Sequence, residues 1–158
     1  MNQIELLAPA GDLTRLKTAV RYGADAVYIG GKQFSLRSRA SNFSLADIKE
    51  GAAFAKQYGV KVHVTVNMLP HEEDLNGLSE YLTALQECGV HAIICASPAI
   101  MMCAKQVAPR LEVHVSTQHS LTNSAAVNYW KCKGADRAVL ARELTLSQLK
   151  EVKQHSEL

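Results

Sequence analysis

Short runs of apolar and β-branched residues alternate along the chain with longer amphipathic segments. Six runs are predicted to be strands, at residues 4–8, 26–30, 60–66, 92–96, 112–116 and 137–141. Successive runs start about 20–35 residues apart, which is the size of a βα unit with its loops. The pattern therefore predicts a parallel sheet wrapped by helices, and no linker or low-complexity tract divides residues 1–158.

The ends of the predicted helices carry their own signals. Glycines that suit the positive φ of a helix C-terminus precede four of the strands: Gly23, Gly59, Gly89 and Gly134. Ser44 and Thr145 are predicted N-caps, and Thr145 with Gln148 matches a capping box. Ser97 precedes a proline at a predicted first helical position. The acidic residues 72–74 predict the start of the third helix, where the helix dipole favours negative charge.

Six βα units are compatible with an open doubly wound sheet or with an incomplete (β/α)8 barrel. A complete barrel has eight units and about 250 residues. Strands of a doubly wound sheet are covered on both faces and usually read as continuous apolar runs. Residues 63–67 and 112–116 instead alternate polar and apolar side chains, which fits a barrel with a polar interior. We therefore predict an α/β fold, a parallel TIM-barrel-like structure that is incomplete, with about six βα units.

Composition excludes several classes of protein. The 158 residues are 47% hydrophobic and 20% charged, which is too apolar and too evenly charged for a disordered chain. A net charge of +2 predicts no broad attraction to nucleic acid or to a membrane. No apolar run approaches the roughly 18 residues that span a bilayer, and no secretory signal precedes the first strand. We expect a cytoplasmic protein.

The four cysteines form no CxxC pair and no zinc-like spacing. They are Cys88, Cys95, Cys103 and Cys132. Each lies in an apolar or helical stretch, so we predict buried or half-buried free thiols in a reducing compartment. We accordingly expect this chain to bind no metal and no cofactor.

The longest predicted loop, residues 31–43, follows the second strand. In parallel α/β proteins ligands bind beyond the carboxyl ends of the strands, where this loop lies. It holds Lys32, Arg37 and Arg39, and two arginines there suit a carboxylate or a phosphate. The alternative is an ordinary solvated basic loop.

Two histidines are predicted to face each other inside the barrel. His63 on the third strand and His114 on the fifth point to the same interior, because alternate strands contribute to one layer, and Glu112 lies nearby. Such a group suits proton transfer or metal binding, whereas a hydrogen-bonded core network is the alternative. The HExxH, P-loop, GxGxxG and GxSxG patterns are absent, so catalytic residues remain unassigned.

Several segments, in the same order along the chain, resemble those of a known family, the collagenase-like peptidases of family U32. The segments are ELLAPAG at 5–11, GADAVYIGG at 23–31, FSLR at 34–37, NF at 42–43, VN at 66–67, HVSTQ at 114–118 and VLAREL at 139–144. The resemblance covers essentially the whole chain. It implies a TIM-like barrel, of which residues 1–158 are the N-terminal part.

Members of this family are named peptidases, although several act in oxygen-independent hydroxylation. Their targets are a tRNA wobble uridine, with prephenate, as well as ribosomal RNA and ubiquinone precursors. Cluster-binding members use four cysteines that follow the segment matched here, so an iron–sulfur cluster is implied only for a longer parent protein. The resemblance therefore implies a part of an RNA-modifying protein, and we expect this part to be inactive by itself.

Under this interpretation, basic residues hold prephenate, or a similar anionic small molecule, and tRNA is the partner of the parent. The predicted substrate-binding residues are Arg37, Arg39, Asn67, Gln118, Arg142 and Glu143. The alternatives are a peptidase and a non-catalytic fragment that assembles with a partner. Because six units leave two sheet edges open, we also expect the chain to self-associate. We expect no membrane partner.

Overall fold

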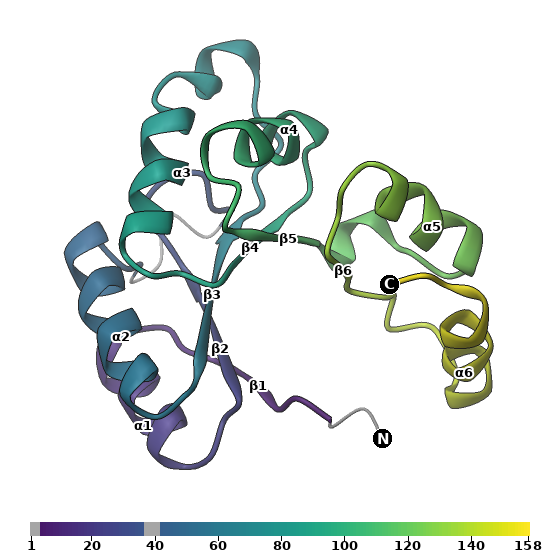
Figure 1. The fold of residues 1–158 in the computed structure, drawn as a ribbon, viewed down its shortest axis with the longest axis horizontal. Helices are drawn as coiled ribbons and strands as arrows, with labels where there is room; N and C mark the ends of the chain where they lie inside the picture. Colours follow the sequence, from purple (N-terminus) through teal and green to yellow (C-terminus); the bar gives the residue numbers. More distant parts are fainter. Residues whose placement is uncertain (1–3, 37–41) are drawn as a thin grey trace.

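A computed structural model describes residues 4–36 and 42–158 and shows one parallel sheet of six strands. The strands follow sequence order from β1 to β6, and the sheet is curled into a half-barrel with its helices around the outside (Figure 1). The strands are β1 (Leu7–Pro9), β2 (Ala26–Gly30), β3 (Lys61–Val66), β4 (Ala92–Cys95), β5 (Glu112–Val115) and β6 (Arg137–Ala138). The predicted incomplete TIM-like barrel is confirmed.

One helix follows each strand, in the order that the amphipathic pattern predicts. The helices are α1 (Leu13–Arg21), α2 (Leu45–Gln57), α3 (Leu78–Glu87), α4 (Pro98–Val107), α5 (Ser124–Cys132) and α6 (Leu146–His155). Two short 3-10 turns, η1 (Glu72–Leu75) and η2 (Thr117–His119), follow β3 and β5. Among the described residues, no helix is both long and apolar enough to cross a membrane.

The core lies between the convex face of the sheet and the helices. Leu16 of α1, Ile48 of α2 and Leu82 of α3 are fully buried and pack toward Val64 and Ile93 of the central strands. Strand residues that alternate with these point to the concave side. This division explains why β3 and β5 carry polar residues at every second position and yet belong to a well-packed domain.

Local signals predicted most helix ends correctly. The four glycines before the strands all have positive φ. Ser44 and Thr145 both form complete capping boxes, whereas only the second was expected. The side chain of Ser97 does not cap α4, although Pro98 occupies the predicted first position. The acidic residues 72–74 start the 3-10 turn η1, and α3 begins later, after Gly77 adopts a left-handed conformation.

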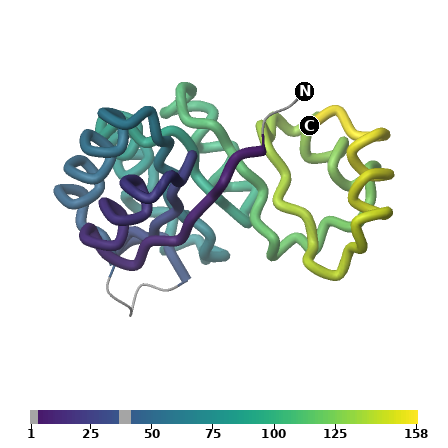
Figure 2. The backbone as a smooth tube through the Cα atoms, turned by 90° about the horizontal axis from the view of Figure 1, so that it is seen from below, coloured from purple at the N-terminus to yellow at the C-terminus, as the bar shows by residue number. Residues whose placement is uncertain are grey.

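The two edges of the sheet are open. β1 pairs only with β2, and β6 pairs only with β5. β6 is only two residues long, shorter than the predicted run, and Figure 2 shows the C-terminal residues on this open side. Ile4 and Leu6, next to β1, are 91% and 58% exposed. A groove of about 490 Å³ beside β6 is lined by α5, α6 and the C-terminal segment.

Candidate functional site at the barrel lumen and strand ends

The concave face of the half-barrel carries a polar cluster contributed by the odd-numbered strands. The ring of His63 on β3 meets the ring of His114 on β5 edge to face, with centroids 4.8 Å apart. Glu112 lies two residues before His114 on the same face. The predicted meeting of these three residues is confirmed, because parallel strands two apart in a barrel supply the same interior layer.

His114 and Glu112 form the one hydrogen-bonded pair of this group. His114 Nε2 lies 2.9 Å from Glu112 Oε2, and because an ionised carboxylate only accepts, this nitrogen carries the proton. Burial lowers the pKa of His114, and the bond to Glu112 offsets part of that effect. Burial is the largest single effect on Glu112 and raises its pKa, but the hydrogen bond from His114 and the nearby charges of His91, His114 and Arg137 together outweigh burial and leave that pKa below its usual value.

His63 is fully buried, and neither of its ring nitrogens has a hydrogen-bond partner among the residues that the structure describes. Burial therefore lowers its pKa to about 3, and the nearby His114 adds to this effect. At neutral pH the ring is uncharged. The predicted hydrogen-bonded network is thus incomplete: His114 has a polar partner, whereas His63 is held by ring contacts.

A third histidine belongs to the cluster and was missed in the sequence. The ring of His91 stacks on that of His63, with centroids 5.8 Å apart. The distance of His91 from the other histidines along the sequence did not indicate this contact. Its Nε2 lies 3.2 Å from Glu112 Oε1, yet the geometry does not make a hydrogen bond and this nitrogen has no such partner. His91 directly precedes β4, so the period-2 pattern within the strands did not include it.

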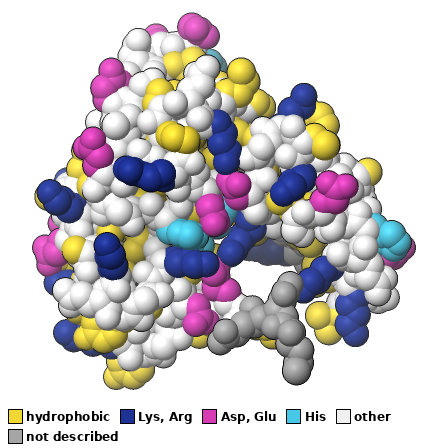
Figure 3. Space-filling view, viewed as in Figure 1, with side chains coloured by type: hydrophobic (Ala, Val, Ile, Leu, Met, Phe, Trp, Pro, Cys, Tyr) yellow, Lys and Arg dark blue, Asp and Glu magenta, His cyan; other side chains and the backbone are white. Residues whose placement is uncertain are grey.

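We define the lumen floor as the cluster of His63, His91, His114 and Glu112 together with three further residues, Glu5, Lys61 and Arg137. The Glu5 carboxylate accepts hydrogen bonds from Arg137 of β6 and from Lys61 of β3, the latter at 3.2 Å. The bond from Arg137 is the main reason that the pKa of Glu5 falls to about 2. Basic, acidic and histidine side chains meet at the hollow of the face shown in Figure 3.

The position of this cluster argues against catalysis. Lys61, Glu112 and Arg137 are the first residues of their strands, so the floor lies at the amino ends, opposite the usual active-site edge of a parallel barrel. Within residues 4–36 and 42–158, no group of three or more His, Cys, Asp or Glu side chains is arranged to hold a metal ion. The position of the lumen floor at the amino ends of the strands favours a structural role for its side chains.

Four of the predicted substrate-binding residues are described by the structure, and they follow the carboxyl ends of β3, β5 and β6. The amide oxygen of Asn67, directly after β3, accepts from the backbone N–H of Leu36 at 3.2 Å. Gln118, in η2 after β5, accepts from the hydroxyl of Ser116 at 3.1 Å. Arg142 and Glu143 are exposed in a turn after β6. They share the carboxyl edge of the sheet, and their roles in binding stay predictions.

Part of the predicted anion site lies outside the described residues. Arg37 and Arg39 belong to the segment 37–41, about which the structure gives no position. The neighbouring part of the same loop is anchored on β3, since the hydroxyl of Ser35 lies 3.2 Å from that of Thr65. Met68 donates its backbone N–H to the carbonyl of Phe34 at 3.2 Å. These bonds hold the start of the loop at the strand ends.

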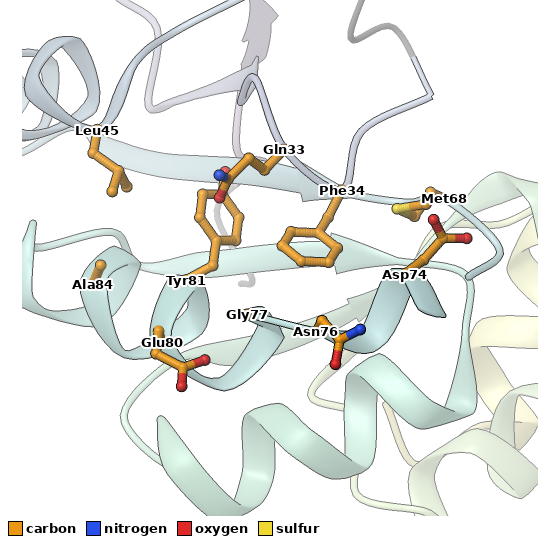
Figure 4. Close-up of a pocket in the computed structure, with 10 residues that line it drawn as sticks. All are labelled: Gln33, Phe34, Leu45, Met68, Asp74, Asn76, Gly77, Glu80, Tyr81 and Ala84. Atoms are coloured by element: carbon orange, nitrogen blue, oxygen red, sulfur yellow. The ribbon is translucent and has the colours of Figure 1, made fainter. Parts of the chain in front are cut away.

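A groove of about 670 Å³ lies beside this edge, between the loops after β2 and β3 and helix α3. Its aromatic wall is formed by Phe34 and Tyr81, whose ring centroids are 5.3 Å apart (Figure 4). Asp74 and Glu80 place two carboxylates along it. Among the predicted substrate-binding residues that the structure describes, Asn67, Gln118, Arg142 and Glu143, none lines the groove.

The cysteines do not fit an iron–sulfur cluster. Cys95 is buried, which raises its pKa to about 12, and burial also raises the pKa of Cys88. Cys103 contacts Ser79, whereas Cys132 is exposed, contrary to the predicted burial of all four. Thiolates are the ligands of such clusters, and buried thiols with raised pKa values supply them poorly. We therefore assign no step to a cluster in this chain.

Comparison with known proteins places these features in context. Residues 11–158 match the family described as peptidase family U32. The chain is 53% identical over 150 residues to tRNA hydroxylation protein P1 of Bacillus subtilis, covering 95% of this chain and 36% of that protein. It is 40% identical over 155 residues to a protein of Methanocaldococcus jannaschii named an uncharacterized protease, covering 98% and 37%. The chain thus spans just over a third of each relative.

The fold has a close counterpart among solved structures. A U32 peptidase superposes with a TM-score of 0.79 at 13% sequence identity, and the match covers 99% of this chain and 66% of that one. At this identity the likeness supports the half-barrel fold and carries no information on substrate.

Proposed function

Because the chain belongs to peptidase family U32, we propose that it forms the N-terminal barrel portion of a tRNA hydroxylation protein. The whole protein would hydroxylate the wobble uridine of tRNA without molecular oxygen, with prephenate as its small-molecule partner. The observation that carries this proposal is the 53% identity to tRNA hydroxylation protein P1 over 95% of the chain.

The proposed prephenate site lies at the carboxyl edge of the half-barrel. Prephenate is a dicarboxylate, and Arg142 is an exposed guanidinium on that edge that suits bidentate binding of a carboxylate. Arg37 and Arg39 follow β2 in the chain and are the other proposed anion ligands. The amides of Asn67 and Gln118 would orient the polar groups of the ligand, with Glu143 accepting from its hydroxyl group.

Deletion of the gene tests the proposed activity. We expect tRNA from a deletion strain to lose its hydroxylated wobble uridine, measured by mass spectrometry of nucleoside digests. Re-expression of the intact gene should restore the modification. An unchanged level of hydroxylated uridine in the deletion strain would contradict the proposal.

Calorimetric titration tests the proposed ligand. We expect prephenate to bind the protein, and Arg142→Ala to weaken binding about 10- to 100-fold, since a charge-assisted hydrogen bond is lost. Arg110→Ala is the matched control, because Arg110 is an exposed arginine that precedes β5 at the opposite end of the sheet. Equal affinities for the wild-type protein and Arg142→Ala would remove Arg142 from the site.

Peptide cleavage is the second candidate function, favoured by the name of the family and by the protease-named relative. A serine nucleophile needs a base within hydrogen-bond reach. Ser116 lies beyond His114 on β5, but its hydroxyl donates to Gln118 and not to a histidine. We therefore expect no cleavage of casein or gelatin above the buffer control, and specific, protein-dependent cleavage would favour this alternative.

A further inference from the structure

Three aromatic rings form a continuous ladder from the strand-end edge onto α5. We define the aromatic ladder as His119, Trp130 and Tyr129. The centroids of His119 and Trp130 are 4.5 Å apart, and those of Trp130 and Tyr129 are 5.5 Å apart at an interplanar angle of 82°. His119 lies in η2, directly after β5, so the ladder begins at the edge where ligands bind parallel barrels.

The outer end of the ladder is exposed and basic. Tyr129 is 57% exposed, and Lys133 Nζ lies 5.5 Å from the centroid of its ring. Lys131 and Lys133 are both exposed on α5 and at its end. The exposed ring of Tyr129 beside the ammonium group of Lys133 offers stacking and ionic contacts together.

The charge of the chain is concentrated in the same region. Residues 120–158 contain six Lys and Arg against four Asp and Glu, whereas residues 1–119 contain eleven of each. The whole net charge of +2 therefore lies in the segment that forms α5, β6 and α6. Lys and Arg side chains lie over this part of the molecule on the face shown in Figure 3.

We propose that the aromatic ladder, with Lys131 and Lys133, is a docking surface for unpaired nucleotides of RNA. Unpaired bases stack on aromatic side chains while lysines neutralise the phosphates that join them. An acidic peptide would use the lysines but would gain little from rings in series. The inference rests on the proposed function, and it specifies which face of the half-barrel meets the RNA.

The location connects the two proposed binding surfaces. Gln118, a predicted ligand of the small molecule, directly precedes His119 at the inner end of the aromatic ladder. RNA stacked on Tyr129 would extend along the ladder toward the strand-end edge. The proposal thus places a nucleotide path beside the predicted anion site without using the lumen floor.

Fluorescence anisotropy with a labelled tRNA anticodon stem-loop tests the surface. We expect Tyr129→Ala to weaken binding about 5- to 100-fold, the range measured for loss of one stacked base, and Tyr129→Phe to bind within about 2-fold of the wild type. Tyr22→Ala is the matched control, since Tyr22 is an 86% exposed tyrosine at the end of α1. Lys133→Ala should reduce the slope of log affinity against log salt by about one.

Trp130 provides an independent readout, because it is the one tryptophan of the chain. We expect RNA to quench its emission in the wild type, and much less so at equal RNA concentration in Tyr129→Ala. The proposal is overturned if the stem-loop does not bind at low salt, or if Tyr129→Ala binds as tightly as the wild type. It is also overturned if Tyr22→Ala loses as much affinity, or if polyglutamate competes as well as unlabelled RNA.

These measurements separate the inference from the proposed function. They require neither prephenate nor hydroxylation, so Tyr129-dependent RNA binding without prephenate binding would support the docking surface and contradict the small-molecule site. Prephenate binding without Tyr129-dependent RNA binding would support the small-molecule site and contradict the docking surface.

Discussion

Glu5 and Arg137 form an ion pair between the segment before the first strand and the start of the last strand, 132 positions apart in the chain. Because β1 and β6 are not paired, this contact joins the two edges of the sheet directly. Lys61 lies on the other oxygen of the same carboxylate. Glu5 therefore ties both edges to the middle of the half-barrel.

We expect Arg137→Ala to destabilise the protein by about 1–2 kcal/mol, a value between those of exposed and buried pairs because both side chains are partly exposed. Hydrogen exchange should also increase in residues 4–10, since β1 loses its link to β6. Denaturant unfolding measures the first effect. Lys17→Ala, which breaks an exposed pair with Glu50, is the control and should cost about 0.5 kcal/mol or less. Equal losses of unfolding free energy in the two variants would show that the link between the edges stabilises the protein no more than an exposed ion pair does.

His63 predicts a loss of stability in mild acid. The unfolded chain takes up a proton near pH 6.5, whereas folded His63 stays neutral down to about pH 3. Stability should therefore fall as the pH drops through 6.5, by about 1.4 kcal/mol per pH unit for each such proton, and level off below about 3. The charged or titratable groups around it are His114, His91, Glu5 and Arg137.

The variant that isolates this effect is His63→Leu. It fills the site with an apolar side chain of similar size and removes the ionisable imidazole. We expect a shallower decline of unfolding free energy between pH 6.5 and 4, and equal or greater stability at pH 7 because two unpartnered nitrogens disappear. The control is His71→Leu, at an exposed position. Identical pH profiles of wild type and His63→Leu would contradict the prediction.

Gly31 and Tyr81 predict a compensating pair of substitutions. A Cβ added at Gly31 would clash with the hydroxyl oxygen of Tyr81, a buried group without a hydrogen-bond partner in the described part of the chain. Gly31→Ala should therefore destabilise by about 1–3 kcal/mol through overpacking. Tyr81→Phe alone should be nearly neutral, and the double variant should recover much of the loss, as measured by a double-mutant cycle. Strict additivity would show that the hydroxyl is not the obstacle.

The open edges predict self-association. β1 and β6 expose unpaired backbone groups, and Leu6 is exposed beside them. We expect dimers at micromolar concentration in size exclusion coupled to light scattering, and Leu6→Glu should shift them toward monomer. Leu69→Glu, a 65% exposed leucine in the loop after β3, is the control. A monomer that is stable across dilution would contradict this expectation.

The sequence predicted features that repeat with a fixed period and missed those that depend on curvature. His63, His114 and Glu112 were found because alternation within a strand fixes the face of each side chain. His91 was missed because it lies one residue before its strand. The pairing of Glu5 with Arg137 follows only from how far the sheet curls, which local patterns do not specify. The length of β6 was overestimated for the same reason. An apolar run forms a strand only where it can pair with a neighbouring strand, and β6 pairs with β5 at two positions.

The strictly sequential order of the strands has a consequence for how the chain acquires its structure. Each new strand adds beside the one made just before it, so every pairing closes a loop of a single βα unit and the entropy lost at each step stays small. The sheet is therefore able to grow from the amino end during synthesis. The salt link between Glu5 and Arg137 differs from these pairings, because its partners are 132 positions apart and it forms only after β6 has left the ribosome.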